Sequence, residues 1–385
     1  MRNEGEGELS PGLIPVDEPW PSVPEEGVAV CLSGGGYRAM LFHLGGIIRL
    51  NEMGHLEKVA RVSSVSAGSI TAAVLGLAWR YLEFSEEHRA ENLDELVVAP
   101  IRKLAGKTID NPSIIWGLLR PDRTITQMLA SYYDKYLFRG TTLEDLPDDS
   151  KGEGPRFVLN ATNLQTGKLF RFSRPYAGDY TVGLWRNPST RLADVVAASS
   201  AYPPTLSPYT AAPSGTFDES TKGPDHREIF RKELWLTDGG VYDNLGLETA
   251  WKRYRTILVS DAGAPLGVDL KPHRNWVQQA MWVSDVVDDQ VRELRKRQLI
   301  DGYERHARKG SYWGIRSDVA SYGLPNPFPF PHESIERARN VPTRLAALDE
   351  ATQADLINWG YVIADTALRK WMYQHQQEPK WLPVT

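Results

Sequence analysis

The chain has 385 residues, of which 41% are hydrophobic and 24% are charged, a globular composition that fits one large domain or two. A formal net charge of −5 excludes a general basic surface for nucleic acid, and the single cysteine, Cys31, excludes an intrachain disulfide. No run approaches the roughly 18 apolar residues of a membrane span, and the first residues lack the apolar core of a secretion signal. We therefore expect a cytoplasmic protein whose membrane contact, where there is one, is local and peripheral.

Residues 1–24 are rich in Glu, Gly and Pro and show no periodicity, which predicts a disordered lead-in. No later segment has the composition of a linker, so residues 25–380 are expected to form a single domain. Within it we distinguish a core over 28–263 and a helical C-terminal part over 271–375.

Short apolar runs typical of buried strands alternate with segments of helical spacing in the first part of the core. Residues 28–32 precede a helix that reaches about residue 52, and residues 59–63 precede a helix over about 69–84. Two further strand-like runs within 157–172 flank a polar turn and predict a hairpin. The alternation of strands and helices predicts an α/β fold with parallel strands.

The second predicted strand runs into the motif Ser64-Val65-Ser66-Ala67-Gly68. A serine on a sharp turn between a strand and a helix exposes its hydroxyl as a nucleophile, and small residues two positions away let the strand and helix approach each other. Gly68 meets that need, while Ser64 stands where a glycine is usual and is only slightly larger. Ser66 is thus a candidate nucleophile, although a serine in such a pattern by itself is more often an ordinary helix cap.

The first predicted strand runs into Ser33 and the glycines Gly34, Gly35 and Gly36, followed by Tyr37 and Arg38. Glycines adopt positive φ readily, so their N–H groups can line up as an anion-binding nest, to which the following helix adds its own N-terminal donors. Such a loop suits the oxyanion of an acyl-transfer reaction. Arg38 either braces this loop or binds a phosphate. The absence of a Lys-Ser or Lys-Thr pair after the glycines argues against a nucleotide P-loop.

Two aspartates stand at the ends of predicted strands, Asp238 and Asp261. Ligands of open α/β sheets gather at strand ends, so both are candidate bases. Asp238 is followed by Gly239 and Gly240, which allow a tight turn that brings the carboxylate close to another loop. None of the eight histidines has a comparable context, which favours a dyad of Ser66 and Asp238.

These motifs resemble those of the patatin-like phospholipase family, and the resemblance covers roughly 28–263. Five blocks carry it: Gly34-Gly35-Gly36-Tyr37-Arg38, Ser64-Val65-Ser66-Ala67-Gly68, Asn160-Ala161-Thr162-Asn163-Leu164-Gln165-Thr166-Gly167, Ala198-Ser199-Ser200-Ala201-Tyr202-Pro203-Pro204 and Asp238-Gly239-Gly240. The resemblance implies a three-layer α/β/α fold with a mainly parallel central sheet, extended here by C-terminal helices. It also implies a catalytic dyad without histidine, acting on acyl esters of lipids.

Carried over residue by residue, the resemblance makes Ser66 the nucleophile and Asp238 the base. The oxyanion loop then comprises Gly34, Gly35, Gly36 and Arg38, and the elbow and turn are shaped by Ser64, Gly68, Gly239 and Gly240. Two positions depart from the family pattern: Ser64 replaces the elbow glycine, and Ala39 follows the arginine where glycine is common. No functional residue follows from the resemblance beyond about Lys271.

The apolar positions from Trp276 to Leu294 recur every three or four residues and predict a long amphipathic helix. We expect this stripe to pack into the core rather than to enter a membrane. The far end of the helix carries Arg292, Arg295, Lys296 and Arg297. Such a basic end is usually solvated, and contact with anionic lipid head groups is the alternative.

The sequence thus predicts a serine acyl hydrolase, of the phospholipase A or lipid esterase type, that forms an acyl-enzyme intermediate and needs neither metal nor cofactor. Its expected partner is a lipid or phospholipid substrate. Two alternatives stay open: a histidine-dependent triad esterase acting on small esters, and a catalytically silent module that binds an anion. The sequence gives no indication of oligomeric state.

Overall fold

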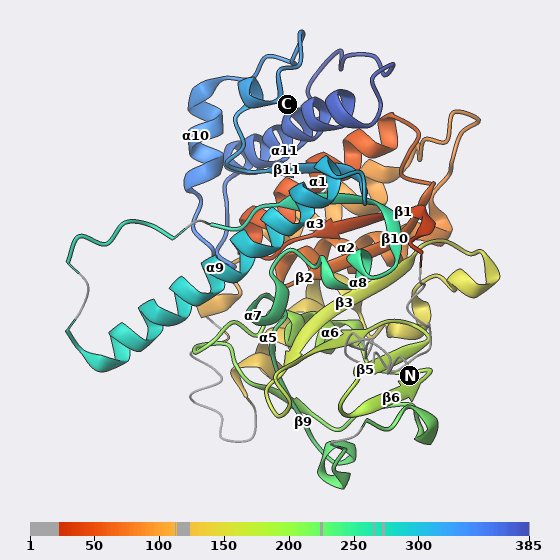
Figure 1. Cartoon of the computed structure of the whole chain (residues 1–385), viewed down its shortest axis with the longest axis vertical. Coiled ribbons are helices and arrows are strands. Elements are labelled where there is room, and N and C mark those ends of the chain that lie inside the picture. Colours follow the sequence, from red (N-terminus) through yellow and green to blue (C-terminus); the bar gives the residue numbers. More distant parts are fainter. Residues whose placement is uncertain are drawn as a thin grey trace, which may run out of the picture.

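The computed structural model describes residues 23–111, 113, 124–223, 226–264, 266–271 and 274–384 (Figure 1). Of the predicted lead-in, all but the last two residues lie outside this part of the chain. No helix in these ranges is both long enough and apolar enough to cross a bilayer.

A mixed sheet, with 11 strands in the described part of the chain, forms the middle layer. Five strands pair in parallel in the order β11 (Lys309–Gly314), β10 (Tyr254–Asp261), β1 (Glu25–Leu32), β2 (Val59–Val65) and β3 (Arg156–Asn163). Beyond β3 the sheet continues antiparallel through β4 (Lys168–Phe172), β5 (Tyr176–Asp179), β6 (Gly183–Arg186) and β8 (Thr216–Asp218). The predicted hairpin is the β3–β4 pair. The strand β9 (Leu234–Asp238) pairs antiparallel with the end of β3 and with β7 (Tyr209–Ala211).

Helices cover both faces of the sheet, which confirms the predicted three-layer α/β/α fold. Along β1, Val30 and Leu32 join the large hydrophobic cluster of one face, while Ala29 and Cys31 join the smaller cluster of the other, as the period of two in a strand requires. The larger layer comprises α1 (Gly36–Glu52), α2 (Ala67–Ala78), α3 (Ala99–Ala105), α5 (Ile125–Tyr133), α6 (Leu192–Ser199), α10 (His332–Asn340) and α11 (Glu350–Trp371). The smaller layer comprises α7 (Gly240–Asp243), α8 (Glu248–Trp251) and α9 (Trp276–Glu304).

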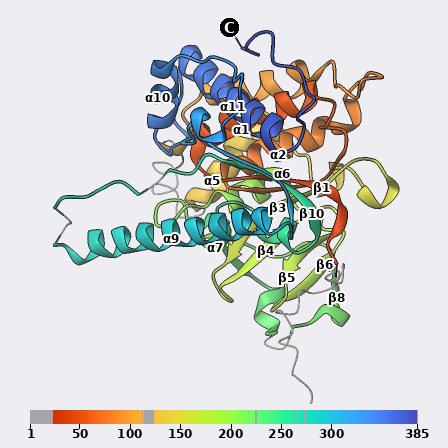
Figure 2. The ribbon, with the colours of Figure 1, turned by 45° about the horizontal axis from the view of Figure 1, so that its top comes forward.

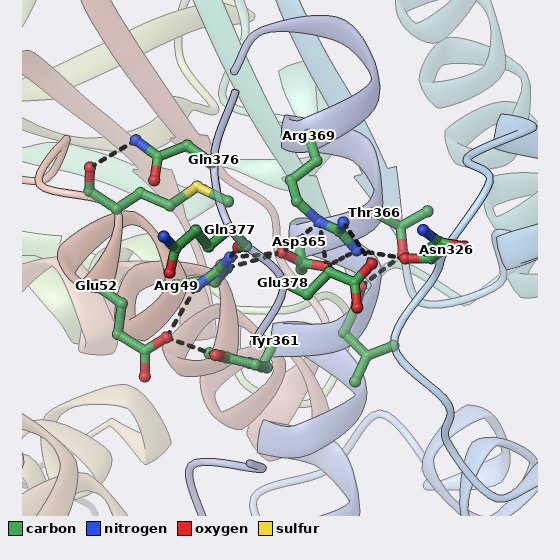
Figure 3. A network of polar contacts seen from close by, with 12 residues as sticks. Arg49, Glu52, Asn326, Tyr361, Asp365, Thr366, Arg369, Gln376, Gln377 and Glu378 are labelled. Atoms are coloured by element: carbon green, nitrogen blue, oxygen red, sulfur yellow. Dashed lines mark hydrogen bonds and ion pairs between the residues drawn. The ribbon is translucent and has the colours of Figure 1, made fainter. Parts of the chain in front are cut away.

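The C-terminal helix α11 packs along α1 and is joined to it by a buried ionic network (Figure 3). The Asp365 carboxylate has no exposed surface and accepts hydrogen bonds from Arg49 Nε at 2.9 Å and Arg369 Nε at 3.0 Å. Arg49 also pairs with Glu52, whose carboxylate accepts the Tyr361 hydroxyl. A single carboxylate thus satisfies two buried guanidinium groups, so the C-terminal part is built into the domain core.

The long helix predicted from Trp276 is present as α9, but the prediction that its apolar stripe packs into the core is wrong. In both ribbon views its first half projects from the body of the molecule (Figures 1 and 2). Trp276 is 77% exposed, and Val283 and Val287 are more than half exposed, whereas Leu299, near the far end, is buried. The periodicity of apolar residues reveals an amphipathic helix, but it does not say whether another element covers the apolar face.

The basic end of α9 also differs from the expected solvated surface. Arg292 is buried, and Arg295 lies against the carboxylates of Glu248 and Asp243. Of the four basic residues, only Arg297 is exposed to solvent. The far half of α9 packs beside α7 and β11, and Arg292, Arg295 and Lys296 each form an ion pair with a carboxylate.

Candidate active site

Two loops meet at one edge of the sheet because they follow neighbouring parallel strands. The pairing of β1 with β2 places Leu32 opposite Ser64, so the glycine loop after β1 and the serine turn after β2 leave the sheet side by side. In α/β sheets this carboxyl edge is where ligands bind.

Ser66 occupies the turn between β2 and α2 with φ 53° and ψ −128°, a strained combination for a residue with a side chain. Its N–H donates to the Ser199 hydroxyl at 2.9 Å, and Ser199 in turn donates to the Asn160 carbonyl at 2.6 Å. These bonds to α6 and β3 hold the turn in place. The backbone therefore has the geometry expected of an exposed nucleophile.

The elbow also needs the close approach that Gly68 provides. A β-carbon at this position would lie 2.6 Å from the carbonyl oxygens of both Leu32 and Ser33, so no side chain fits. Ser64, which replaces the usual glycine on the other side, is buried with its Oγ 3.0 Å from the Ser69 hydroxyl. A serine is tolerated there because its hydroxyl has a partner.

Asp238 is the last residue of β9, which pairs with the end of β3, so it lies at the same edge of the sheet. It is only 3% exposed, its carboxylate accepts the Gly240 N–H at 2.7 Å, and it lines the same cavity as Ser66. Burial is the main reason why the pKa of Asp238 rises to about 7, with a smaller contribution from Asp288, while the Gly240 N–H and the nearby Ser66 hydroxyl oppose the rise. A β-carbon on Gly239 would lie 2.4 Å from the Asn160 carbonyl oxygen of β3, and one on Gly240 would lie 2.9 Å from the side-chain oxygen of Asn244.

Of the three loop glycines, Gly35 and Gly36 line the cavity and Gly34 does not. The Gly34 N–H donates to the Asn244 carbonyl at 3.1 Å, so it is committed to the fold. Within the described chain no acceptor bonds to the N–H groups of Gly35 and Gly36. Gly36 has φ 63° and a β-carbon there would lie 2.6 Å from the Arg344 backbone, so the position requires glycine.

Arg38 does not line the cavity. Its Nε donates to the Ala262 carbonyl at 3.0 Å, its Nη1 to the Val341 carbonyl at 2.6 Å and its Nη2 to the Thr343 hydroxyl at 2.8 Å. Burial lowers the pKa of Arg38 to about 10. Of its two predicted roles, the structure shows the bracing one, because each guanidinium nitrogen is bonded to a segment that surrounds the glycine loop.

The other candidate base, Asp261, is tied to its own turn. Its carboxylate accepts the Gly263 N–H at 2.9 Å and the Tyr312 hydroxyl at 2.7 Å, and it does not line the cavity. His43, on the helix behind the loop, is hydrogen-bonded to the Ser33 carbonyl and the Ser260 hydroxyl. Burial lowers its pKa to about 4, so it is neutral at neutral pH.

The cavity over Ser66 and Asp238 has a volume of about 640 Å³. None of its described lining residues is a histidine. Its wall includes residues from the C-terminal part for which the sequence predicted no role. They include Asp285, Asp288, Asp289, Arg292 and Arg344.

Four residues that hold or line the site were not predicted to do so: Ser199, Asn244, Arg292 and Arg344. Ser199 belongs to the family-like block that begins at Ala198. That block was the one sequence signal that could have identified Ser199 as the residue whose hydroxyl holds Ser66. Asn244 follows the Gly239-Gly240 turn, and its carbonyl fixes Gly34. Nothing in the local sequence of Arg292 or Arg344 indicates that they approach the cavity, because the fold alone brings their segments there.

A serine on a strained turn beside a buried carboxylate, at the carboxyl edge of an α/β/α sheet, defines the class as that of α/β proteins with a hydrolase-type nucleophile elbow. The family model described as patatin-like phospholipase matches residues 30–251. The chain therefore belongs to the patatin-like phospholipase family, as the sequence motifs indicated.

Two solved human structures are similar in fold. Human GIVD cytosolic phospholipase A2 aligns with a TM-score of 0.51 at 13% identity, over 90% of this chain and 61% of that chain. Its complex with methyl gamma-linolenyl fluorophosphonate aligns with a TM-score of 0.52 at 14% identity, over 90% and 58%. The chain thus spans about three fifths of the length of these proteins. A search of curated proteins gave no match.

Proposed function

We propose that this protein is a serine acyl hydrolase that cleaves fatty acyl esters of lipids through a dyad of Ser66 and Asp238. The observation that carries the proposal is a shared cavity, which Ser66 on its strained turn and the buried Asp238 carboxylate line together with Gly35 and Gly36. Membership of the family supports the lipid substrate.

In the first half-reaction, the Ser66 oxygen attacks the ester carbonyl while Asp238 takes the hydroxyl proton. The negative oxygen of the tetrahedral intermediate is stabilised by the N–H groups of Gly35 and Gly36, at the positive N-terminal end of α1. When the carbon–oxygen bond to the alcohol breaks, Asp238 returns the proton to the leaving alcohol. The acyl group is then bonded to Ser66.

In the second half-reaction, a water molecule attacks the acyl-Ser66 carbonyl and Asp238 takes a proton from that water. The intermediate collapses, Ser66 regains its proton from Asp238, and the fatty acid leaves. A carboxylate with an ordinary pKa is a weak base for these steps, so a pKa of about 7 for Asp238 suits the role at neutral pH.

A histidine-dependent triad is not favoured by the geometry. In the described ranges no histidine lines the cavity. Both ring nitrogens of His43, which follows the glycine loop, are within hydrogen-bond distance of protein oxygens, at 2.7 and 2.8 Å.

The covalent step can be tested with a fluorophosphonate probe and mass mapping of the adduct. Labelling should occur at Ser66 and vanish in Ser66→Ala, while Ser200→Ala, which removes another serine of the cavity wall, should still be labelled. Lipid mass spectrometry after incubation with wild type and Ser66→Ala should show fatty acid release by wild type alone. Full esterase activity in Ser66→Ala would refute the proposal. An unlabelled protein that binds anions tightly would favour the silent module.

We further propose a peripheral membrane contact through the projecting start of α9 and the loop before it. Val268, Leu270 and Trp276 are exposed there, and Val277 and Met281 continue the apolar surface. Aromatic and apolar side chains of this kind partition into the headgroup region of bilayers. The helix that carries them also lines the cavity through Arg292, which would bring the site close to the lipid surface.

Flotation with phosphatidylcholine vesicles tests this contact. Trp276→Ser should reduce the vesicle-bound fraction, whereas Trp381→Ser, at a tryptophan near the C-terminus that is 68% exposed, should leave it unchanged. Equal binding of both variants would contradict the assignment of the surface. The cytoplasmic location stays a prediction, which cell fractionation would test.

A further inference from the structure

The side-chain amide of Asn244 has no bond that the fold requires. Asn244 lines the cavity and is half-buried, and no described residue is hydrogen-bonded to its amide. Its backbone already has a function, since its carbonyl accepts the Gly34 N–H at 3.1 Å. Asn160, by contrast, is buried and donates from its amide to the Ser64 carbonyl at 2.9 Å. A polar side chain that lines a reaction cavity with both of its polar atoms unengaged is available to a reactant.

The Asn244 amide oxygen lies between the glycine loop and the turn that follows Asp238. A β-carbon on Gly34 would lie 2.5 Å from this oxygen and 3.0 Å from the Ser66 Cβ. A β-carbon on Gly240 would lie 2.9 Å from the same oxygen and 3.0 Å from Asp238 Oδ1. The Asn244 and Asp238 oxygens are therefore no more than about 6 Å apart, a gap that one water molecule can bridge with two hydrogen bonds.

The backbone beside Asn244 is fixed, so its side chain starts from a defined position. Asp243 is fully buried, and its carboxylate accepts the N–H groups of Leu245 at 3.2 Å and Glu248 at 2.7 Å. Arg295 lies 3.8 Å from the same carboxylate. A side chain on a turn held in this way meets a reactant at little cost in ordering, as a catalytic group must.

The two proposed half-reactions make different demands on an acceptor beside Asp238. The leaving alcohol of the first half-reaction needs one proton, which Asp238 returns to it. The attacking water of the second has two hydrogens, of which Asp238 takes one. The other hydrogen needs an acceptor of its own if the lone pair of the water oxygen is to point at the acyl carbonyl. An oxygen at this place therefore serves deacylation and not acylation.

We propose that Asn244 is a third catalytic residue, whose amide oxygen accepts the second hydrogen of the attacking water while Asp238 takes the first. The water oxygen bonds to the acyl carbon, the bond from that carbon to Ser66 Oγ breaks, and Asp238 returns its proton to Ser66. The fatty acid leaves with the hydrogen that Asn244 oriented. This inference rests on the proposed acyl-enzyme mechanism and adds a residue that acts in its second half alone.

Burst kinetics with a 4-nitrophenyl ester separate the two half-reactions. Asn244→Ala should release about one nitrophenolate per enzyme as fast as the wild type and then turn over about 10- to 100-fold more slowly. Because kcat/KM reports only the steps up to acylation, kcat and KM should fall together and leave kcat/KM unchanged. Intact-protein mass spectrometry should show acyl-Ser66 accumulating in the variant.

Asn326→Ala is the matched control for these measurements. Asn326 is an exposed asparagine that does not line the cavity, and its backbone carbonyl accepts Arg369 Nη2 at 2.7 Å. Like Asn244→Ala, the change removes an amide and keeps the backbone carbonyl. It should leave both the burst and the later turnover at the wild-type values.

Methanol, as a competitor of water, gives a readout that does not depend on the amount of active enzyme. Its one hydroxyl hydrogen passes to Asp238 and its oxygen bonds to the acyl carbon, which gives a methyl ester and free Ser66. Methanol needs no second acceptor, so the ratio of methyl ester to fatty acid should rise about 10-fold in Asn244→Ala. Asn244→Asp, which keeps an oxygen at this place, should hold the ratio near the wild-type value. Its added charge should shift the pH dependence of kcat to higher pH, because a like charge raises the pKa of Asp238.

The outcomes distinguish this inference from the proposed function. An unchanged product ratio and unchanged turnover in Asn244→Ala, with normal labelling of Ser66, would overturn the role of Asn244 alone. Equal losses of kcat/KM and of labelling rate would overturn it too, because they would place Asn244 in the first half-reaction or in the framework of the site. A wild type that forms no acyl-Ser66 would refute the proposed function and this inference with it. If Asn244→Ala does not fold, as judged by circular dichroism, the product ratio of Asn244→Leu, which has a similar volume without polar atoms, decides the matter.

Discussion

Replacement of Asp238 by asparagine should remove activity and, at the same time, stabilise the folded protein at alkaline pH. The carboxylate is buried and its pKa rises to about 7, mainly through desolvation. In the unfolded chain its pKa returns to about 4. Between these values the folded state binds a proton that the unfolded state has already lost, so stability falls as pH rises from about 4 to about 7. Asparagine has no such titration.

The magnitude follows from the two pKa values. The two pKa values differ by about 3 units, and each unit corresponds to about 1.36 kcal/mol. Ionisation of Asp238 therefore lowers the free energy of unfolding by at most about 4 kcal/mol above pH 7 and by almost nothing near pH 4. The asparagine oxygen can still accept the Gly240 N–H, although without the charge that strengthens this bond in the wild type. We therefore expect a net gain of about 1 to 4 kcal/mol at pH 8.

Urea unfolding of wild type and Asp238→Asn at pH 5 and pH 8 measures this difference. The variant should gain more at pH 8 than at pH 5, while Asp301→Asn, a control on the exposed side of α9, should show no such dependence. For the same reason, kcat/KM of the wild type should rise with pH through an apparent pKa near 7. If Asp238→Asn were destabilised equally at both pH values, desolvation could not be what raises the pKa of Asp238.

Two further predictions concern the framework of the site. Gly68→Ala should destabilise the protein by about 1 to 3 kcal/mol and lower kcat, because a methyl group would lie 2.6 Å from two carbonyl oxygens; Gly267→Ala, with open space around it, is the control in thermal melts and ester assays. Asp365→Ala should cost about 3 to 5 kcal/mol in urea unfolding, since it leaves Arg49 and Arg369 buried without their carboxylate (Figure 3). A loss below about 1 kcal/mol would mean that water or another acceptor replaces that carboxylate.

Much of the fold could be predicted from local pattern. The strand, glycine loop and helix that begin at β1, and the strand, serine turn and helix that begin at β2, were identified because period-two and period-three-to-four patterns are local properties. The boundaries were less accurate: the helix after Ser66 ends at Ala78, before the residue 84 that its apolar pattern suggested. The antiparallel pairing of β9 with β3 depends on contacts between distant segments, which local pattern does not contain.

The arginines show why the site could be predicted only in part. Arg38 follows the glycines directly, so it was assigned to the oxyanion loop, but the guanidinium points to segments around residues 262 and 341–343. Arg292 was assigned to a solvated helix end and instead lies in the cavity wall. The direction of a long side chain depends on which acceptors the tertiary fold places around it.

By itself, the sequence determined the residue types and local turns on which the chemistry depends: the serine flanked by small residues, the consecutive glycines, and the aspartate before two glycines. Those features depend on backbone conformation over a few residues, which side-chain size and glycine content control directly. Only the tertiary structure decided that Asp238 and Ser66 line one cavity, that the Gly34 N–H is hydrogen-bonded to the Asn244 carbonyl, and that α9 projects with its apolar face exposed. Each of these depends on which distant segments pack together, and burial by those segments is also what raises the pKa of Asp238.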